Sequence, residues 1–146
     1  MDGVNDVAEA ITKGHYILLT SVFTQTEVLN STLSDEARIK FRGLFQRKNC
    51  QMAAADQRVI SLSHDLRDHY QKQKAIDSLP SLGTLDAIHL ATAILYEVKE
   101  FHTFDERDEP RKRRALIPLS GNVAGHNLTI CKPPIPPMVQ QRIEGI

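Results

Sequence analysis

The run YILLTS, residues 16–21, constrains the fold of this chain more than any other segment. Its residues are apolar without alternating with polar ones, a pattern typical of an interior parallel strand that is covered on both faces. Residues 4–13 before it place apolar side chains at helical spacing and are followed by Gly14, so they predict a short amphipathic helix. A helix followed by a buried strand predicts an α/β fold with a parallel sheet.

The rest of the chain continues this alternation of helices and strands. Helical patterns occur around residues 37–45, over 52–74 and over 86–100, and the last is apolar on nearly all sides, which predicts a buried helix. Short strands are predicted at 100–104 and 128–132. The segment PPIPP that follows cannot continue a β-ladder. We therefore expect one domain over residues 1–132 and an extended, proline-rich tail over 133–146.

Composition restricts the possible partners and compartments. Eighteen basic and eighteen acidic residues give a formal charge of zero, so any contact with nucleic acid must be local. Cys50 and Cys131 form no Cys-x-x-Cys or Cys/His pattern, so a disulfide or a structural zinc site has little support, and both are expected to be small buried residues. No apolar run approaches the roughly 20 residues that span a bilayer. We expect a soluble, cytoplasmic protein.

Three acidic residues stand at comparable positions in the predicted α/β order. Glu27 follows the strand YILLTS, Asp86 opens the buried helix, and Asp105 ends the strand FHTF. The carboxyl ends of parallel strands gather at one edge of a sheet, where ligands bind. Carboxylates brought together there favour a hard cation, Mg²⁺ or Mn²⁺, which can activate water for attack on a phosphodiester.

Each acid also has a purely structural explanation. Glu27 would complete a helix capping box with Thr24, Asp86 would interact with the positive end of a helix dipole, and Asp105 would start a turn. Taken one at a time, these explanations are favoured over a metal site. Only the context of the three acids together changes that balance.

That context resembles a known family. TSVFTQTEVLN, SLGTLDAIHLATAILYEV and FHTFDER, in this order, resemble the three later motifs of PIN-domain ribonucleases, the class that includes the toxins of many bacterial toxin–antitoxin pairs. The resemblance implies a three-layer α/β/α fold with a central parallel sheet and a magnesium- or manganese-dependent hydrolase that cleaves RNA. It implies that Glu27, Asp86 and Asp105 are the catalytic, metal-binding residues, matching the second, third and fourth acids of the family's site.

One part of the family's pattern has no counterpart here. The family begins with an apolar strand that ends in an Asp, whereas Asp2 and Asp6 of this chain follow no apolar run. We therefore expect the first strand and the first acid to be missing, either because Met1 is an internal start or because this is a degraded copy. The sheet would then lack its middle strand and leave unpaired edges on YILLTS and FHTF, and we expect this truncation to impair the nuclease activity of the chain.

The expected partners follow from the resemblance and from these edges. They are an RNA substrate, an antitoxin protein and, through the open edges, a second copy of the chain in a homodimer. The basic block at residues 111–114 would hold an RNA backbone or form a solvated loop, and Asp108 would be an auxiliary acid or a turn residue, with neither alternative favoured. A catalytically inactive binding module and a fragment without independent function remain as alternatives to the nuclease.

Overall fold

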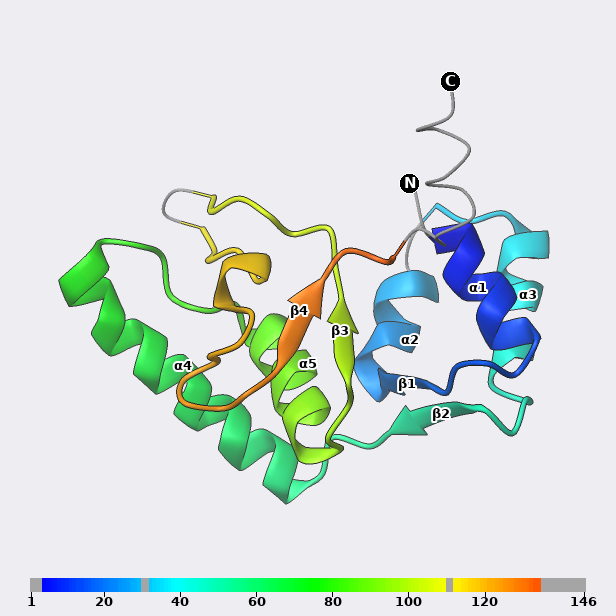
Figure 1. Ribbon diagram of the computed structural model, residues 1–146, viewed down its shortest axis with the longest axis horizontal. Helices are drawn as coiled ribbons and strands as arrows, with labels where there is room; N and C mark the ends of the chain where they lie inside the picture. The colour runs from blue at the N-terminus through cyan, green and yellow to red at the C-terminus, as the bar shows by residue number, and fades with distance from the viewer. Residues whose placement is uncertain (1–3, 30–31, 110–111, 135–146) are drawn as a thin grey trace, which may run out of the picture.

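The computed structural model describes residues 4–29, 32–109 and 112–134 and shows an α/β fold with parallel strands (Figure 1). In chain order the elements are α1 (Val4–Thr12), β1 (Leu18–Ser21), α2 (Val22–Leu29), α3 (Asp35–Leu44), β2 (Cys50–Ala53), α4 (Gln57–Asp77), α5 (Thr84–Leu95), β3 (Glu100–His102), the 3₁₀ helix η1 (Ile117–Leu119) and β4 (Thr129–Cys131).

The strands form two separate parallel pairs rather than one sheet. β1 pairs with β2, with Leu18 opposite Cys50, and β3 pairs with β4, with Glu100 opposite Thr129. Figure 1 shows β1 and β3 as the inner strands, between β2 and β4. Within the described ranges no strand pairs with the inner edge of either one. In Figure 1 the two pairs run across one another, and the expected loss of a middle strand stays a prediction.

The hydrophobic core lies around α5. Six of the twelve residues of α5 are buried, which confirms the prediction of a buried helix. The helix packs against α4 and against the C-terminal segment that leads into β4. The core residues with the least exposure are Val59, Leu66, Leu82, Ala87, Leu90, Ala91, Ala115 and Val123. Because α5 packs against other segments on several sides, the backbone at its N-terminus has a fixed position in the fold.

The predicted helix over 52–74 is wrong at its start. Residues 50–53 form β2, and α4 begins only at Gln57. The Asp56 carboxylate accepts hydrogen bonds from the backbone N–H groups of Arg58 and Val59, at 3.0 and 3.1 Å, and so caps the helix. The sequence CQMA carries little strand preference, so its pairing with β1 is a tertiary effect.

Other boundaries differ by a few residues. The predicted helix over 86–100 ends at Leu95, and the strand predicted at 100–104 ends at His102. Residues 135–146 of the predicted tail lie outside the described ranges. No helix among the described residues is long and apolar enough to cross a membrane.

Candidate active site

Glu27 lies in the second turn of α2 and reaches across to α5. Its carboxylate and His89 Nε2 are 2.9 Å apart, and its side chain is about half exposed. α2 begins directly after β1, at Val22, so Thr24 lies inside the helix and the predicted capping box with Glu27 is wrong. The Ser21 hydroxyl accepts the hydrogen bond from Phe23 N–H instead, at 3.2 Å. Glu27 is therefore available for a role other than capping.

Asp86 lies in the first turn of α5, behind Gly83. The N-cap residue Gly83 forms no side-chain capping bond, and a Cβ atom at this position would come within 3.0 Å of Asp86 Oδ2. Burial raises the pKa of the Asp86 carboxyl, and the nearby charge of Arg113 opposes this. The negative charges of Asp105 and Glu27 raise the pKa further. The three predicted acids therefore lie within electrostatic reach of one another.

Asp105 lies three residues beyond β3, in a loop held by the main chain. Its N–H donates to Thr103 Oγ at 3.2 Å, and its carbonyl accepts from Ile117 N–H at 3.0 Å. The side chain is only 10% exposed, and its Oδ1 is 3.5 Å from Arg113 Nη2. Its Oδ2 is buried without a hydrogen-bond partner, the one such side-chain atom within the described ranges. Such an atom calls for an explanation, and an ion is one.

The three acids fit a magnesium site in their chemistry but are not drawn tightly together. Carboxylate oxygens are the ligands that Mg²⁺ and Mn²⁺ select, and the unpartnered Oδ2 of Asp105 leaves a free donor. The ligand atoms of Glu27, Asp86 and Asp105 do not all lie within 4.8 Å of one another. The Glu27 carboxylate contacts His89, and the Asp105 carboxylate contacts Arg113. Because the three negative charges also repel one another, the acids lie farther apart than the ligands of a bound ion would.

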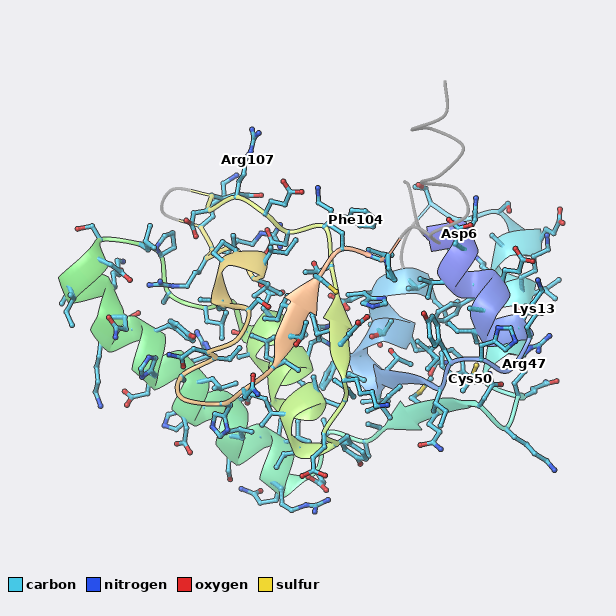
Figure 2. All side chains as sticks on the ribbon, viewed as in Figure 1. Asp6, Lys13, Arg47, Cys50, Phe104 and Arg107 are labelled. Carbon is cyan, nitrogen blue, oxygen red and sulfur yellow. The ribbon has the colours of Figure 1, made fainter. Side chains whose placement is uncertain are left out.

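A surface hollow of about 670 Å³ opens beside Asp105. The loop after β3 lines it with basic Arg107 and Arg113 and with Phe104, which is 41% exposed. Four acidic residues line it as well: Asp105, Glu106, Asp108 and Glu109. Figure 2 shows Phe104 and Arg107 along this loop. An aromatic ring beside guanidinium groups suits a nucleic acid, because the ring stacks on bases while the cations contact phosphates.

The structure divides the basic block at residues 111–114. Arg113 faces the site, whereas Arg114 is buried, with its guanidinium donating to Asp77 and to the carbonyl of Pro80. Arg111 lies outside the described residues. Asp108 Oδ1 accepts from Ala115 N–H at 2.9 Å, which favours the structural reading of that residue. Sequence reasoning had no means of separating Arg113 from Arg114, because both occur in one charged run.

Comparison with known proteins gives one match. The family model of the PIN domain matches residues 2–113. No curated protein and no solved structure matches the chain. The matched region contains β1, α2, α5 and β3, and with them all three predicted acids. Since it spans more than half of the 146 residues, the chain belongs to the PIN-domain family.

Proposed function

We propose that this protein is a magnesium- or manganese-dependent endoribonuclease of the toxin type, with Glu27, Asp86 and Asp105 as its metal-coordinating residues. PIN domains are in general nuclease-like, which supports the reaction class. The observation that carries the choice of residues is the buried, unpartnered Oδ2 of Asp105, in a site where Asp86 and Glu27 add further negative charge. An unsatisfied buried oxygen costs about 1–3 kcal/mol, so a cation that binds it is favoured.

The chain's own residues divide the work of binding and positioning. Asp86 and Asp105 would hold the ion from α5 and from the loop after β3, while His89 orients the Glu27 carboxylate through their 2.9 Å contact. Arg113 balances the charge of Asp105 and Asp86. When bound, Mg²⁺ supplies a water of lowered pKa and neutralises phosphate charge. The net reaction adds water across a phosphodiester bond of RNA.

The hollow beside Asp105 supports an RNA substrate and cleavage within a strand. Arg107 and Arg113 offer phosphate contacts and Phe104 offers a stacking surface, while the acids of the same lining repel phosphate until a cation is bound. The net charge of zero agrees with binding through this local surface alone. An antitoxin that covers the same surface, a homodimer and a cytoplasmic location belong to this proposal.

A second candidate is an RNA-binding PIN domain without catalysis. It is favoured by the spacing of the three acids, whose ligand atoms do not all lie within 4.8 Å, and by the pairing of Asp105 with Arg113. Such a module would keep the hollow and bind single-stranded RNA. It would not respond to magnesium.

The two candidates separate in one experiment. Cleavage of a fluorescently labelled single-stranded RNA is followed with Mg²⁺, with Mn²⁺ and with EDTA, and RNA binding is measured in parallel by anisotropy. We expect metal-dependent cleavage in the wild type and a rate at least about 100-fold lower in Asp105→Asn. Loss of an outer-shell partner of a metal site already lowers activity by up to about 100-fold, and Asp105 is proposed as a direct ligand. Asp65→Asn, on the exposed face of α4, is the matched control. Binding without cleavage in the wild type would support the inactive module instead.

A further inference from the structure

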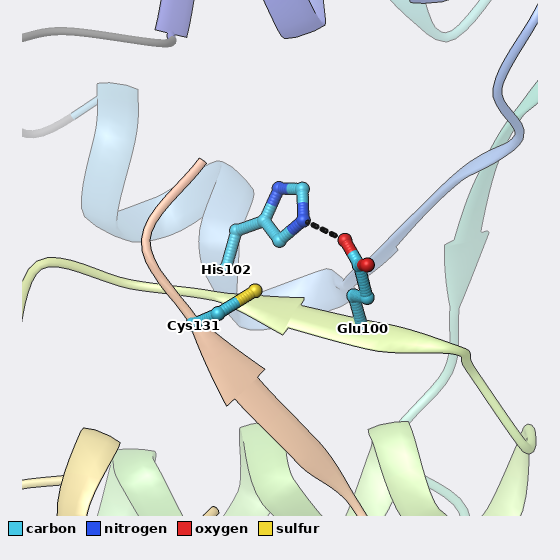
Figure 3. Close-up of side chains that lie close together, drawn as sticks. All are labelled: Glu100, His102 and Cys131. Carbon is cyan, nitrogen blue, oxygen red and sulfur yellow. Dashed lines mark hydrogen bonds and ion pairs between the residues drawn. The ribbon is translucent and has the colours of Figure 1, made fainter. Parts of the chain in front are cut away.

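A second group of potential metal ligands lies on the β3–β4 pair, apart from the three acids. Glu100 and His102 on β3 and Cys131 on β4 each offer a ligand atom, and these atoms all lie within 4.8 Å of one another (Figure 3). His102 Nε2 is 2.8 Å from Glu100 Oε2. This is the one such group among the residues that the structure describes.

The strand geometry accounts for the cluster. Glu100 and His102 are two residues apart on β3, so their side chains leave the same face of the strand. The parallel register places Cys131 of β4 opposite His102. The alternate residues Phe101 and Ile130 face the core instead. The three polar side chains therefore meet on the face that looks away from the core, where His102 is 25% and Glu100 50% exposed.

We propose that Glu100, His102 and Cys131 form a zinc site that joins β3 to β4. A thiolate, an imidazole and a carboxylate are the three ligand types that Zn²⁺ takes, and a thiolate does not suit Mg²⁺. Three protein ligands leave one tetrahedral position for water. Since the ligands come from both strands, the ion would fasten together a sheet of only two strands, which is marginal on its own.

Proton balance follows from the state of Cys131. Burial raises the pKa of its thiol, and the charge of Glu100 raises it further. The thiol therefore carries its proton at neutral pH, and the proton leaves to the buffer when the sulfur binds Zn²⁺. Glu100 Oε2 and His102 Nε2 exchange their contact with each other for contacts with the ion, and the proton shared between them leaves Nε2 for Nδ1 or for the buffer.

The site shares no ligand with the proposed nuclease centre. Asp105 follows His102 by three residues but belongs to the loop beyond β3, with Thr103 and Arg113 as its neighbours. Zinc binding and RNA cleavage should therefore be separable by mutation.

Two measurements on the full chain test this proposal. Thermal unfolding is followed against Zn²⁺ concentration, and the near-ultraviolet band of a Co²⁺–thiolate bond is followed against Co²⁺ concentration. We expect the Tm to rise with Zn²⁺, as for any ligand that binds only the folded state, and the Co²⁺ band to appear. Cys131→Ala should remove the band and weaken zinc binding at least about 10-fold, the lower end of what loss of an outer-shell partner costs.

The matched control is Cys50→Ala, the other cysteine, which lies buried on β2. It should keep the band and the zinc response, and so should Asp105→Asn, even though that variant loses the proposed cleavage. If Cys131→Ala fails to fold by circular dichroism, Glu100→Gln at an exposed position replaces it and should also weaken zinc binding. Equal zinc affinity in the wild type, Cys131→Ala and Glu100→Gln, or a zinc response lost only in Asp105→Asn, would overturn the proposal.

Discussion

At the scale of single residues, Asp86 is subject to two opposing effects. A carboxylate in the first turn of a helix gains about 0.3–1 kcal/mol from the helix dipole. Burial raises the pKa of Asp86, and the charges of Asp105 and Glu27 raise it further, while Arg113 and His89 lower it. Since the net direction is upward, the ionised form of Asp86 destabilises the fold in the metal-free protein.

A prediction for Asp86→Asn follows with a definite sign. A raised pKa in the folded state means that the protonated acid contributes stability below its ordinary pKa of 3.8, and that this contribution is lost as the pH rises through the folded-state value. Asp86→Asn should therefore have a higher Tm than the metal-free wild type at neutral pH, and this advantage should vanish below pH 3.8. Cleavage should fall at least about 100-fold, as for loss of a metal ligand.

Thermal melts from pH 3 to 8 in EDTA check this, with Asp65→Asn on exposed α4 as the control. A variant that is less stable than the wild type at neutral pH would mean that the helix-dipole role of Asp86 dominates.

Substitution by Met should have different effects on stability and RNA binding at the neighbouring residues Arg113 and Arg114. Arg114→Met removes the donor to the buried Pro80 carbonyl, so it should lower the free energy of unfolding by about 1–3 kcal/mol. Arg113 is 43% exposed and faces the site, so Arg113→Met should lower stability less than Arg114→Met does, through the lost pairing with Asp105. It should weaken RNA binding uniformly and reduce the salt slope by about one. Urea unfolding measures the stability of both variants, and fluorescence anisotropy against salt concentration measures their RNA binding. A larger loss of stability in Arg113→Met, or a larger loss of RNA binding in Arg114→Met, would contradict the roles given to the two residues.

Residue-level motifs were readable in the sequence, but the contacts between distant segments were not. The DAIHLA motif located Asp86 and its helix, whereas the partner of Glu27, His89, lies 62 residues away. Both cysteines were expected to be buried, which is confirmed for Cys50 but wrong for Cys131, which is only partly buried. The proximity of Cys131 to His102 could not be predicted, because it depends on the register of two strands. A Glu-x-His pair on a predicted strand was the one available signal.

At the scale of elements, the strongly patterned segments were predicted and the weakly patterned one was not. Residues 16–21 and 86–100 form the expected types of element, a strand over Leu18–Ser21 and a helix over Thr84–Leu95. The burial expected on both faces of the strand is wrong, because only Ser21 of β1 is buried and Tyr16 and Ile17 are exposed. β2 was taken for the start of a helix, because Gln, Met and Ala favour helices and only pairing with β1 makes them a strand. The expectation of one sheet was likewise incomplete, since the structure has two pairs.

Because β1 and β3 are each paired on one side only, their backbone N–H groups should alternate between slow and fast hydrogen exchange. Leu18 N–H donates to Asn49 carbonyl and Thr103 N–H to Cys131 carbonyl, each toward the outer partner. Since main-chain groups alternate in direction along a strand, the N–H groups of Leu19 and His102 point to the inner edges. Hydrogen exchange should be at least about 10-fold faster at Leu19 than at Leu18, equivalent to a bond worth about 1.4 kcal/mol. Equal protection at low protein concentration would mean that the inner edge is already paired.

At the scale of the whole molecule, we expect the unpaired edges of β1 and β3 to promote association in solution. Unpaired parallel strands invite pairing with another chain, and the exposed Tyr16 and Ile17 lie just before β1. We expect concentration-dependent association, with exchange at Leu19 and His102 slowing as the concentration rises. Sedimentation velocity over a range of concentrations measures it, and a monomer throughout would contradict it.

An added strand that pairs between β1 and β3 should prevent the association through their open edges. An apolar, β-branched segment of about six residues, the usual strand length, that ends in Asp would be fused through a flexible linker before α1. It can pair with both inner edges at once, and net stability is only about 5–15 kcal/mol, so several new hydrogen bonds should raise the Tm by several degrees. Association should cease, and metal-dependent cleavage should increase because the added Asp joins the three acids. The control is the same segment with two central prolines, which cannot form both ladders. If both fusions melt and associate like the parent chain, the space between β1 and β3 does not accept a strand.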